Sequence, residues 1–257
     1  MAVRQTAERR QEIKRLILAG SLPSMGEMAD RFDVSRETIR KDLLLLEKEG
    51  LGKKGYGGTF IADTVIERNL GFRLTENNEK KKAIARAALS FISSGSAIFL
   101  DAGSTTLELA RALQSMPDLH IITNSAIIPQ AMAESLCTVT CLGGSLRKSS
   151  LAFTGSLTLN AVQAFHTDIA FLGVDGFDEN GPCTTIFSEA EVKRAMAEKA
   201  HQRILLCDSS KLDKTASVPF CTWGAIDMLI TDNGISDSKA IALKNKVTLV
   251  IAKDSEV

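Results

Sequence analysis

Near the amino terminus, apolar residues recur at the spacing of an amphipathic helix. Ile13, Leu16 and Ile17 lie on one helical face, which predicts a first helix that starts at about Arg9 and ends near Gly20. The polar residues between them would face solvent. This stretch therefore predicts a surface helix that packs on a small core.

Two further helical patterns follow at short intervals. Ser24 and Glu27 form the S-x-x-E pattern of a capping box, which predicts the start of a second, short helix. Ser35 is suited to cap a third helix that ends near Gly50. Asp33, in the turn between these two helices, tolerates left-handed backbone. Two short helices joined so closely are typical of a helix-turn-helix, whose second helix enters the DNA major groove.

The segment 51–61, LGKKGYGGTFI, contains two short strand-like pieces around glycines, which predicts a hairpin wing. Arginine and lysine bind phosphates and base edges. For any one of these side chains, a solvated surface charge is the alternative interpretation. The candidate DNA ligands, at the start of the third helix and in the wing, are Ser35, Arg36, Thr38, Arg40, Lys41, Lys53, Lys54 and Tyr56.

Beyond residue 78, short apolar runs alternate with helical patterns of about 10 to 15 residues, which implies right-handed β-α-β crossovers. Such crossovers favour a mainly parallel, doubly wound sheet. The expected fold class is α/β, with a winged helix-turn-helix over 1–61, a polar linker over 62–78 and a larger Rossmann-like domain over 79–257.

Polar residues and glycines gather where the predicted strands end. In a parallel sheet these ends share one edge, which is where ligands bind. Asp101 and the following G-S-T-T open a helix, so backbone N–H groups and hydroxyls can surround an anion there. Glu189 and Lys193, four apart on a predicted helix, form either a surface pair or part of the same site. The five polar strand ends are 101–106, 123–125, 143–144, 175–176 and 208–211.

Charge refines this division of the chain. The chain has 31 Lys and Arg and 31 Asp and Glu, hence a formal charge of zero, which by itself disfavours a nucleic-acid partner. The first 60 residues, however, carry 12 basic and nine acidic side chains, whereas the remainder carries 19 and 22. The basic surplus therefore coincides with the predicted helix-turn-helix.

The remaining composition argues against several classes of protein. Five cysteines without a C-x-x-C pair argue against a disulfide framework or a metal site. No apolar run approaches the roughly 20 residues of a membrane helix. We therefore expect a cytoplasmic protein with no membrane partner, no metal and no cofactor.

The motifs resemble those of a known family. The run VSRETIRKDLLLLEKEGLGKKGYGGTF is similar to the amino-terminal signature of DeoR-type bacterial transcriptional repressors. The motifs D-x-G-S-T-T, T-N-S, G-G, F-L-G-V-D-G, E-A-E-V-K-R-A-M and D-S-S-K resemble, in order, the effector domain of that family. The resemblance covers essentially the whole chain.

The resemblance implies an effector domain similar in fold to ribose-5-phosphate isomerase, and a phosphorylated sugar or sugar derivative that releases the repressor from operator DNA. It also implies a homo-oligomer, dimer or tetramer, with no catalytic residues. The segment PCTTIFS replaces the T-x-N-E motif of many relatives, so the particular sugar stays open. The implied effector-binding residues are Asp101, Gly103, Ser104, Thr105, Thr106, Thr123, Asn124, Gly143, Gly144, Asp175, Glu189, Lys193 and Lys211.

A sugar-phosphate isomerase or deaminase with an accessory DNA-binding module is the alternative. Aldose–ketose exchange needs only a positioned carboxylate and a cation, and Asp101, Asp175, Glu189 and Lys211 are conceivable groups. None of the histidines follows a predicted strand, however, which favours a regulator over an enzyme.

Overall fold

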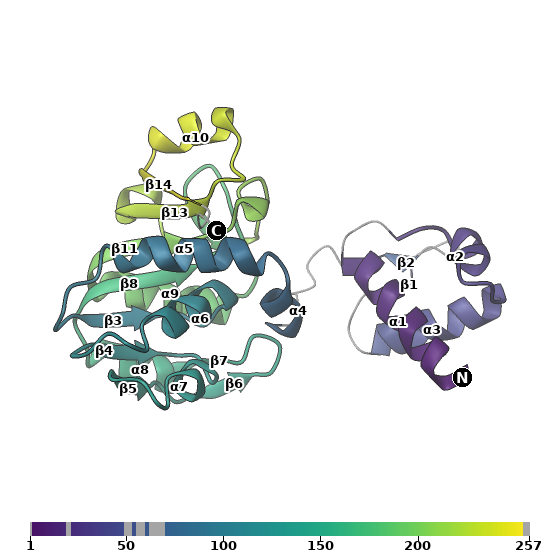
Figure 1. Ribbon diagram of the computed structural model, residues 1–257, viewed down its shortest axis with the longest axis horizontal. Helices are drawn as coiled ribbons and strands as arrows, with labels where there is room; N and C mark the ends of the chain where they lie inside the picture. Colours follow the sequence, from purple (N-terminus) through teal and green to yellow (C-terminus); the bar gives the residue numbers. More distant parts are fainter. Residues whose placement is uncertain (1, 19–21, 49–52, 55–59, 62–69, 254–257) are drawn as a thin grey trace. The chain divides into compact units, whose positions relative to one another are not determined.

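The computed structural model describes residues 2–18, 22–48, 53–54, 60–61 and 70–253. Contacts divide the chain into two compact units, Met1–Arg68 and Asn69–Val257 (Figure 1). Among the described helices, none combines the length and the apolarity needed to cross a bilayer.

The first unit is a small helical domain with a strand pair. Helices α1 (Ala2–Leu18), α2 (Met25–Arg31) and α3 (Arg36–Lys48) enclose an apolar core, and β1 (Lys53–Lys54) pairs antiparallel with β2 (Phe60–Ile61). The helix-turn-helix prediction is confirmed, although α1 begins earlier than predicted. The core includes Ile13, Ile17, Met28, Ala29, Ile39, Leu43 and Leu46.

Local capping fixes the ends of these helices. The Oγ of Ser24 accepts the Glu27 N–H at 3.3 Å, and Glu27 Oε2 accepts the Ser24 N–H at 2.8 Å, which completes the predicted capping box. Asp33 has φ of 49°, the left-handed turn expected there. The Oγ of Ser35 accepts the Thr38 N–H at 3.1 Å, so each predicted cap satisfies an amide at the start of its helix.

Asp42 ties α3 to α1 beneath the surface. Its side chain is 2% exposed and receives Arg9 Nε at 2.7 Å and Arg10 Nε at 2.6 Å. These two basic residues of the first helix therefore serve the fold of this unit, because their charges compensate a buried carboxylate.

We expect Asp42→Asn to destabilise the first unit by about 1–3 kcal/mol, the range for hydrogen bonds to charged groups. Amide hydrogen exchange in α1 and α3 measures this, and Asp30→Asn, an exposed position on α2, is the matched control. Equal protection of both variants and the parent would show that the Asp42 pairs contribute nothing.

The second unit is built on a seven-stranded sheet whose neighbouring strands are all parallel, in the order β14-β13-β11-β8-β3-β4-β5. The predicted doubly wound α/β fold is confirmed. The strands are β3 (Ala97–Leu100), β4 (His120–Thr123), β5 (Thr138–Cys141), β8 (Thr167–Gly173), β11 (Ala200–Leu206), β13 (Met228–Asp232) and β14 (Thr248–Ala252).

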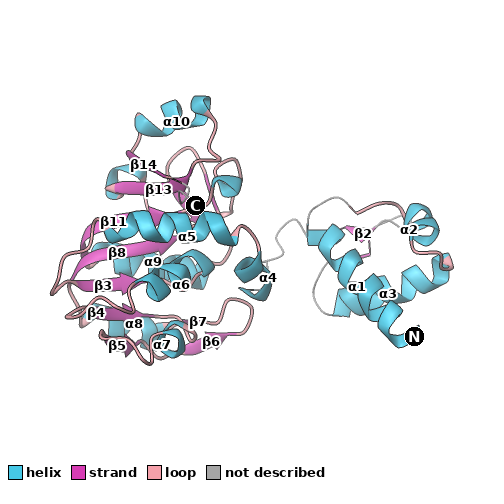
Figure 2. Ribbon diagram, in the orientation of Figure 1, coloured by secondary structure: helices cyan, strands magenta, loops and turns pink. Residues whose placement is uncertain are grey.

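Helices cover both faces of this sheet (Figure 2). Along β8, Ile169 and Phe171 join one core, whereas Ala170 and Leu172 join the other. Successive strand residues point to opposite faces, so a strand buried on both sides has a continuous apolar sequence. One core includes residues of α5 (Asn78–Leu89), α6 (Ser104–Ala112) and α7 (Ile128–Ala131), and the other includes residues of α8 (Ser156–Gln163), α9 (Phe187–Glu198) and α10 (Asp237–Lys244).

Several short elements were not predicted. Helix α4 (Leu70–Thr75) lies inside the segment 62–78 that we expected to be a linker. Helix α8 was not predicted from the sequence either. Strands of two or three residues are too short for their periodicity to show. These strands are the hairpin β6 (Ser145–Arg147) and β7 (Ala152–Thr154), and the small antiparallel sheet of β9 (Gly176–Phe177), β10 (Pro182–Thr184) and β12 (Val218–Pro219).

The strand order creates one switch point. From β3 the chain proceeds outward through β4 and β5, then returns to form β8 on the other side of β3 and proceeds outward through β11, β13 and β14. The carboxyl ends of β3 and β8 therefore adjoin a crevice from which the connections diverge, the usual ligand position in an open α/β sheet.

Candidate functional site

Helix α3 presents a polar face opposite its buried side. Ile39 is fully buried, whereas Arg36, Arg40 and Lys41 are exposed. Arg40 donates from Nε and Nη2 to Glu37, both at 2.7 Å. These cations therefore lie at the surface of the helix, where Arg40 is paired with Glu37 of the same helix.

The other predicted DNA ligands divide into two groups. The Ser35 and Thr38 hydroxyls lie 2.9 Å apart and hydrogen-bond to each other, so both take part in capping α3. Lys53 and Lys54 form β1, as the wing prediction requires, whereas Tyr56 lies outside the described residues.

A small cavity lies at the β3–β8 switch point, and we call it the switch-point cavity. Many of the predicted effector-binding residues line it, whereas Asp101 is not among the lining residues and contacts Lys193, which is. The lining residues that the sequence predicted are Gly103, Ser104, Thr105, Thr106, Asp175, Glu189, Lys193 and Lys211.

The start of α6 forms one wall. Gly103 is its N-cap, and no side chain caps this helix end. The Oγ1 of Thr106 donates to Asp101 O at 2.6 Å and Gly103 O at 3.0 Å, which holds the turn. The amides of the first helical turn have no intrahelical acceptor, so such a helix end attracts an anion.

Lys193 and Asp101 join the ends of β3 and β8. Both side chains are at most 5% exposed, and Lys193 Nζ contacts Asp101 Oδ2 and donates to Gly173 O at 3.0 Å. Asp101 Oδ2 also accepts the Gly173 N–H at 3.1 Å. Lys193 is therefore part of the cavity wall, and its predicted alternative, a surface pair with Glu189, is wrong.

Glu189 is held from the hairpin side of the cavity. Its Oε1 accepts Arg147 Nε at 3.1 Å and the Ser150 hydroxyl at 2.5 Å. The carboxylate is 9% exposed, so these donors compensate most of the loss of its hydration.

Asp175 provides a second carboxylate at the cavity. Burial alone would raise its pKa, but the charges of Lys211, Arg73 and Lys193 and a hydrogen bond from Thr184 together hold this pKa well below its usual range. The Thr184 hydroxyl lies 2.8 Å from Asp175 Oδ2. Asp175 is therefore ionised at neutral pH and suited to accept hydrogen bonds from ligand hydroxyls.

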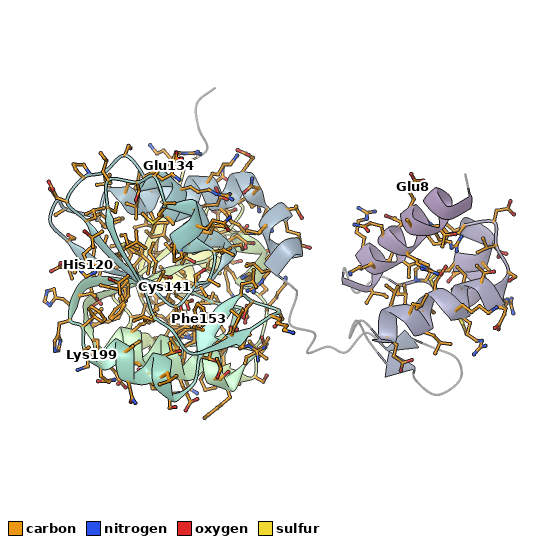
Figure 3. The ribbon with its side chains drawn as sticks, turned by 90° about the horizontal axis from the view of Figure 1, so that it is seen from below. Glu8, His120, Glu134, Cys141, Phe153 and Lys199 are labelled. Atoms are coloured by element: carbon orange, nitrogen blue, oxygen red, sulfur yellow. The ribbon has the colours of Figure 1, made fainter. Side chains whose placement is uncertain are left out.

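Four other predicted residues do not line the switch-point cavity. Asn124 Oδ1 accepts the Ala102 N–H at 2.9 Å and its Nδ2 donates to Phe153 O at 3.3 Å, while Thr123 Oγ1 donates to Leu100 O at 2.6 Å. Figure 3 labels Phe153, whose carbonyl accepts this Asn124 hydrogen bond. The side chains of Thr123 and Asn124 therefore position the turn that leads into α6.

The glycine pair after β5 has a backbone role. Gly144 has φ of 144°, and a Cβ there would lie 2.8 Å from Thr154 O. The carbonyl of Gly143 accepts the Thr158 hydroxyl at 2.7 Å. Gly144 therefore allows β5 to lead closely into the β6–β7 hairpin, whereas Gly143 contributes only its carbonyl.

Arg73 and Thr184 also line the cavity and were not predicted. Arg73 comes from α4, inside the expected linker. The i,i+4 pair Leu70 and Leu74 was a weak helical signal, but no sequence pattern indicates that this helix reaches the strand ends.

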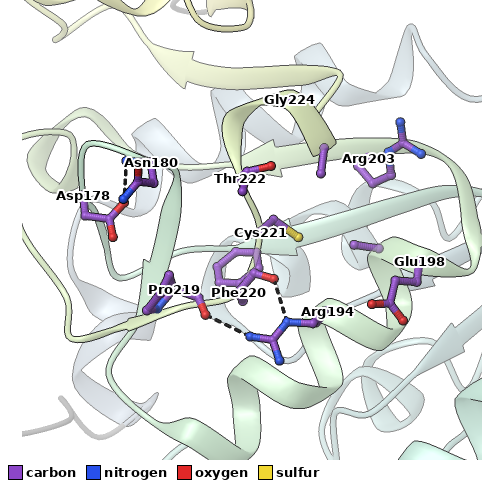
Figure 4. Close-up of a pocket in the computed structure, with 12 residues that line it drawn as sticks. Asp178, Asn180, Arg194, Glu198, Arg203, Pro219, Phe220, Cys221, Thr222 and Gly224 are labelled. Carbon is purple, nitrogen blue, oxygen red and sulfur yellow. Dashed lines mark hydrogen bonds between the residues drawn. The ribbon is translucent and has the colours of Figure 1, made fainter.

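A second hollow, of about 780 Å³, lies beside α9, β12 and the 3-10 turn η3 (Trp223–Ala225) (Figure 4). Arg194 enters this hollow but donates to Pro219 O at 3.1 Å and Phe220 O at 3.3 Å. Its guanidinium therefore fixes the segment after β12 against α9. The residues that line this hollow include none of the predicted effector ligands.

A helix-turn-helix unit joined to an α/β unit with a cavity at the switch point of its sheet is the architecture of ligand-responsive DNA-binding regulators. The DeoR-like helix-turn-helix domain matches residues 9–65, and the DeoR C terminal sensor domain matches residues 76–233. The chain belongs to the DeoR family of transcriptional regulators, as the sequence motifs predicted, and is a repressor of that type.

Proteins of similar sequence are also named as transcriptional regulators. The chain is 35% identical, over 90% of its length and 87% of the relative's, to an Escherichia coli O157:H7 protein provisionally named as the aga operon transcriptional repressor. It is 29% identical, over 88% of its own length and 90% of the relative's, to the glycerol-3-phosphate regulon repressor of Escherichia coli K12. Such relatives are named as regulators and not as enzymes. Among solved structures, the chain is similar to the ribose 5-phosphate isomerase of Methanocaldococcus jannaschii. The match covers 53% of this chain and 55% of the isomerase chain, with 20% sequence identity and a TM-score of 0.38.

Proposed function

We propose that this repressor controls a carbohydrate-utilisation operon, and that a phosphorylated sugar or sugar derivative bound in the switch-point cavity releases it from its operator. The observation that carries the proposal is the uncapped start of α6 facing a cavity that Lys193, Lys211 and Arg73 also line. A helix N-terminus with nearby cations favours a phosphate.

The carboxylates of the cavity suit the rest of such a ligand. Asp175 and Glu189 line the same space and can accept hydrogen bonds from sugar hydroxyls. Lys193 is paired with Asp101, and Glu189 with Arg147. Lys211 and Arg73 lie outside these pairs, and with Asp175, whose pKa their charges lower, they leave a surplus of positive charge at the cavity for an anionic ligand. The name of the glycerol-3-phosphate regulon repressor is consistent with a small phosphorylated polyol.

On the DNA side, we propose contacts from Arg36, Thr38, Arg40 and Lys41 on α3, together with Ser35 and, in the wing, Lys53, Lys54 and Tyr56. One winged helix makes a small DNA interface. Two or four subunits would present paired recognition helices to a palindromic or repeated operator, and light scattering of the purified protein would measure this assembly.

Mobility shift with DNA from upstream of the gene, titrated with a panel of phosphorylated hexoses, pentoses, hexitols and amino sugars, tests the function. One phosphorylated ligand should weaken DNA binding roughly 5- to 150-fold, the range for allosteric coupling of about 1–3 kcal/mol. Its unphosphorylated parent should have no effect. Protein that never retards this DNA, even at low salt, would contradict the proposal.

Lys211→Met, with Lys244→Met on exposed α10 as the matched control, assigns the response to the cavity. The first variant should retain DNA binding and lose sensitivity to the ligand, whereas the control should behave as the parent protein does. An unchanged ligand response in Lys211→Met would place the effector elsewhere.

A further inference from the structure

Arg73 enters the switch-point cavity with an unused hydrogen-bonding edge. Its Nε and Nη2 are buried and have no hydrogen-bond partner within the described part of the chain. These two nitrogens form the side-on edge of the guanidinium, which binds two oxygens of one anion simultaneously. An unpaired buried donor is unfavourable, so this edge is suited to an anionic ligand.

Helix α4 carries Arg73 and is held at both of its ends, by the loop of the β6–β7 hairpin at its start and by α5 at its end. At its start, the Leu70 N–H donates to Ser149 O at 2.8 Å, next to the Ser150 that holds Glu189. At its end, the buried Lys81 amine donates to Arg73 O and to Glu76 O.

The turn after α4 is fixed to the other side of the cavity. Asn77 Nδ2 donates to Asp208 Oδ1 and Ser210 Oγ, both at 3.1 Å, in the segment that carries Lys211. Helix α4 therefore connects the loop of the β6–β7 hairpin to the loop after β11. It is also the first described element after residues 62–69, which join this unit to the DNA-binding unit.

The cavity is too small for a sugar phosphate as it stands. The centre of a water molecule can occupy only about 20 Å³ among the lining side chains, which is room for one or two waters, whereas ligand sites usually measure about 300–1,000 Å³. Binding therefore requires part of the wall to move.

Two cationic residues of the wall differ in how firmly they are held. Lys193 forms a buried ion pair and lies on the twelve-residue α9, whereas Arg73 lies on the six-residue α4.

We propose that the Nε and Nη2 edge of Arg73 binds the phosphate of the effector, and that α4 moves when this contact forms. The proposal rests on the proposed function, because it assigns a further ligand of the same effector. Helix α4 is also the described element of this unit that lies nearest in sequence to the DNA-binding unit.

The test uses the full-length protein with inorganic phosphate and with the phosphorylated sugars of the panel. Binding is measured as the rise in melting temperature that each ligand causes. Sodium chloride at the same ionic strength is the control that separates phosphate binding from the general screening of charges. Arg73→Gln should weaken phosphorylated-ligand binding at least 10-fold. Arg73→Lys should fall between this variant and the parent, because an ammonium retains the charge and loses the two-nitrogen edge. Arg86→Gln, at an exposed position of α5, should bind as the parent does.

Mobility shift gives a second measure. Arg73→Gln should bind DNA with the parent's affinity and require at least 10-fold more ligand for release. If it binds and responds to the ligand as the parent does, the proposal for Arg73 is wrong while the proposed function stands. If the parent itself responds to no phosphorylated ligand, both fail.

Hydrogen exchange of the unmodified protein tests the movement of α4 without relying on the stability of a variant. The amides of 70–76 should change their exchange rate when the phosphorylated ligand saturates the protein, whereas those of α10 should not. Unchanged exchange at 70–76 under saturation would overturn the movement of α4.

Discussion

Replacing Lys193 by methionine should lower the free energy of unfolding of the sensor unit by about 3–5 kcal/mol, the usual effect of removing one partner of a buried ion pair. The Asp101 carboxylate, 3% exposed, would be left buried without the ammonium that compensates it. The Gly173 carbonyl would lose the Lys193 Nζ donor, which lies 3.0 Å from it. The ends of β3 and β8 would thus lose the side chain that joins them.

Urea denaturation followed by fluorescence measures this loss in the correct unit, because the single tryptophan, Trp223, lies there. Lys244→Met, at an exposed position, is the matched control. The double variant Asp101→Asn with Lys193→Met should recover part of the stability, because it removes the uncompensated charge as well. A single variant as stable as the parent would contradict the importance of this pair.

The double variant Arg36→Ala with Arg40→Ala should weaken operator binding about 30-fold or more, since each lost arginine contact typically contributes about 1–3 kcal/mol. Both side chains lie on the exposed face of α3, and neither belongs to the core that includes Ile39. The fold of the first unit and the thermal stabilisation by the effector should therefore persist.

Mobility shift at several salt concentrations measures this change and its origin. Lost phosphate contacts should reduce the slope of log affinity against log salt by about 0.9 for each contact, whereas lost base contacts should reduce sequence discrimination. Arg15→Ala, a 74% exposed side chain on α1, is the control. Parent-like DNA binding by the double variant would move the DNA interface away from the start of α3.

The helix-turn-helix could be predicted because its signals are local. The capping box joins Ser24 to Glu27, and Ser35 caps an amide three residues away. Side-chain periodicity then indicates which face of each helix is buried. The role of Asp42 could not be predicted in this way, because its partners Arg9 and Arg10 are more than 30 residues distant.

The cavity was only partly predictable. Parallel strands place their carboxyl ends at one edge, which correctly brought the start of α6, Asp175 and Lys211 together. Asn124 and Gly144 also follow strand ends and are therefore expected at the same site, although β4 and β5 lie on the outer side of β3. Periodicity contains no information about which strands are neighbours, so it could not separate the residues that line the cavity from those that shape its backbone.

The sequence by itself determined the two units, the family and the edge of the sheet at which we propose the ligand site, because these depend on local motifs, periodicity and the direction of β-α-β crossovers. Only the tertiary structure decided that Lys193 pairs with Asp101 and that Arg73 reaches the switch-point cavity from the expected linker. The two residues of the first pair lie 92 positions apart, and such contacts arise from strand order and packing, which no local pattern encodes.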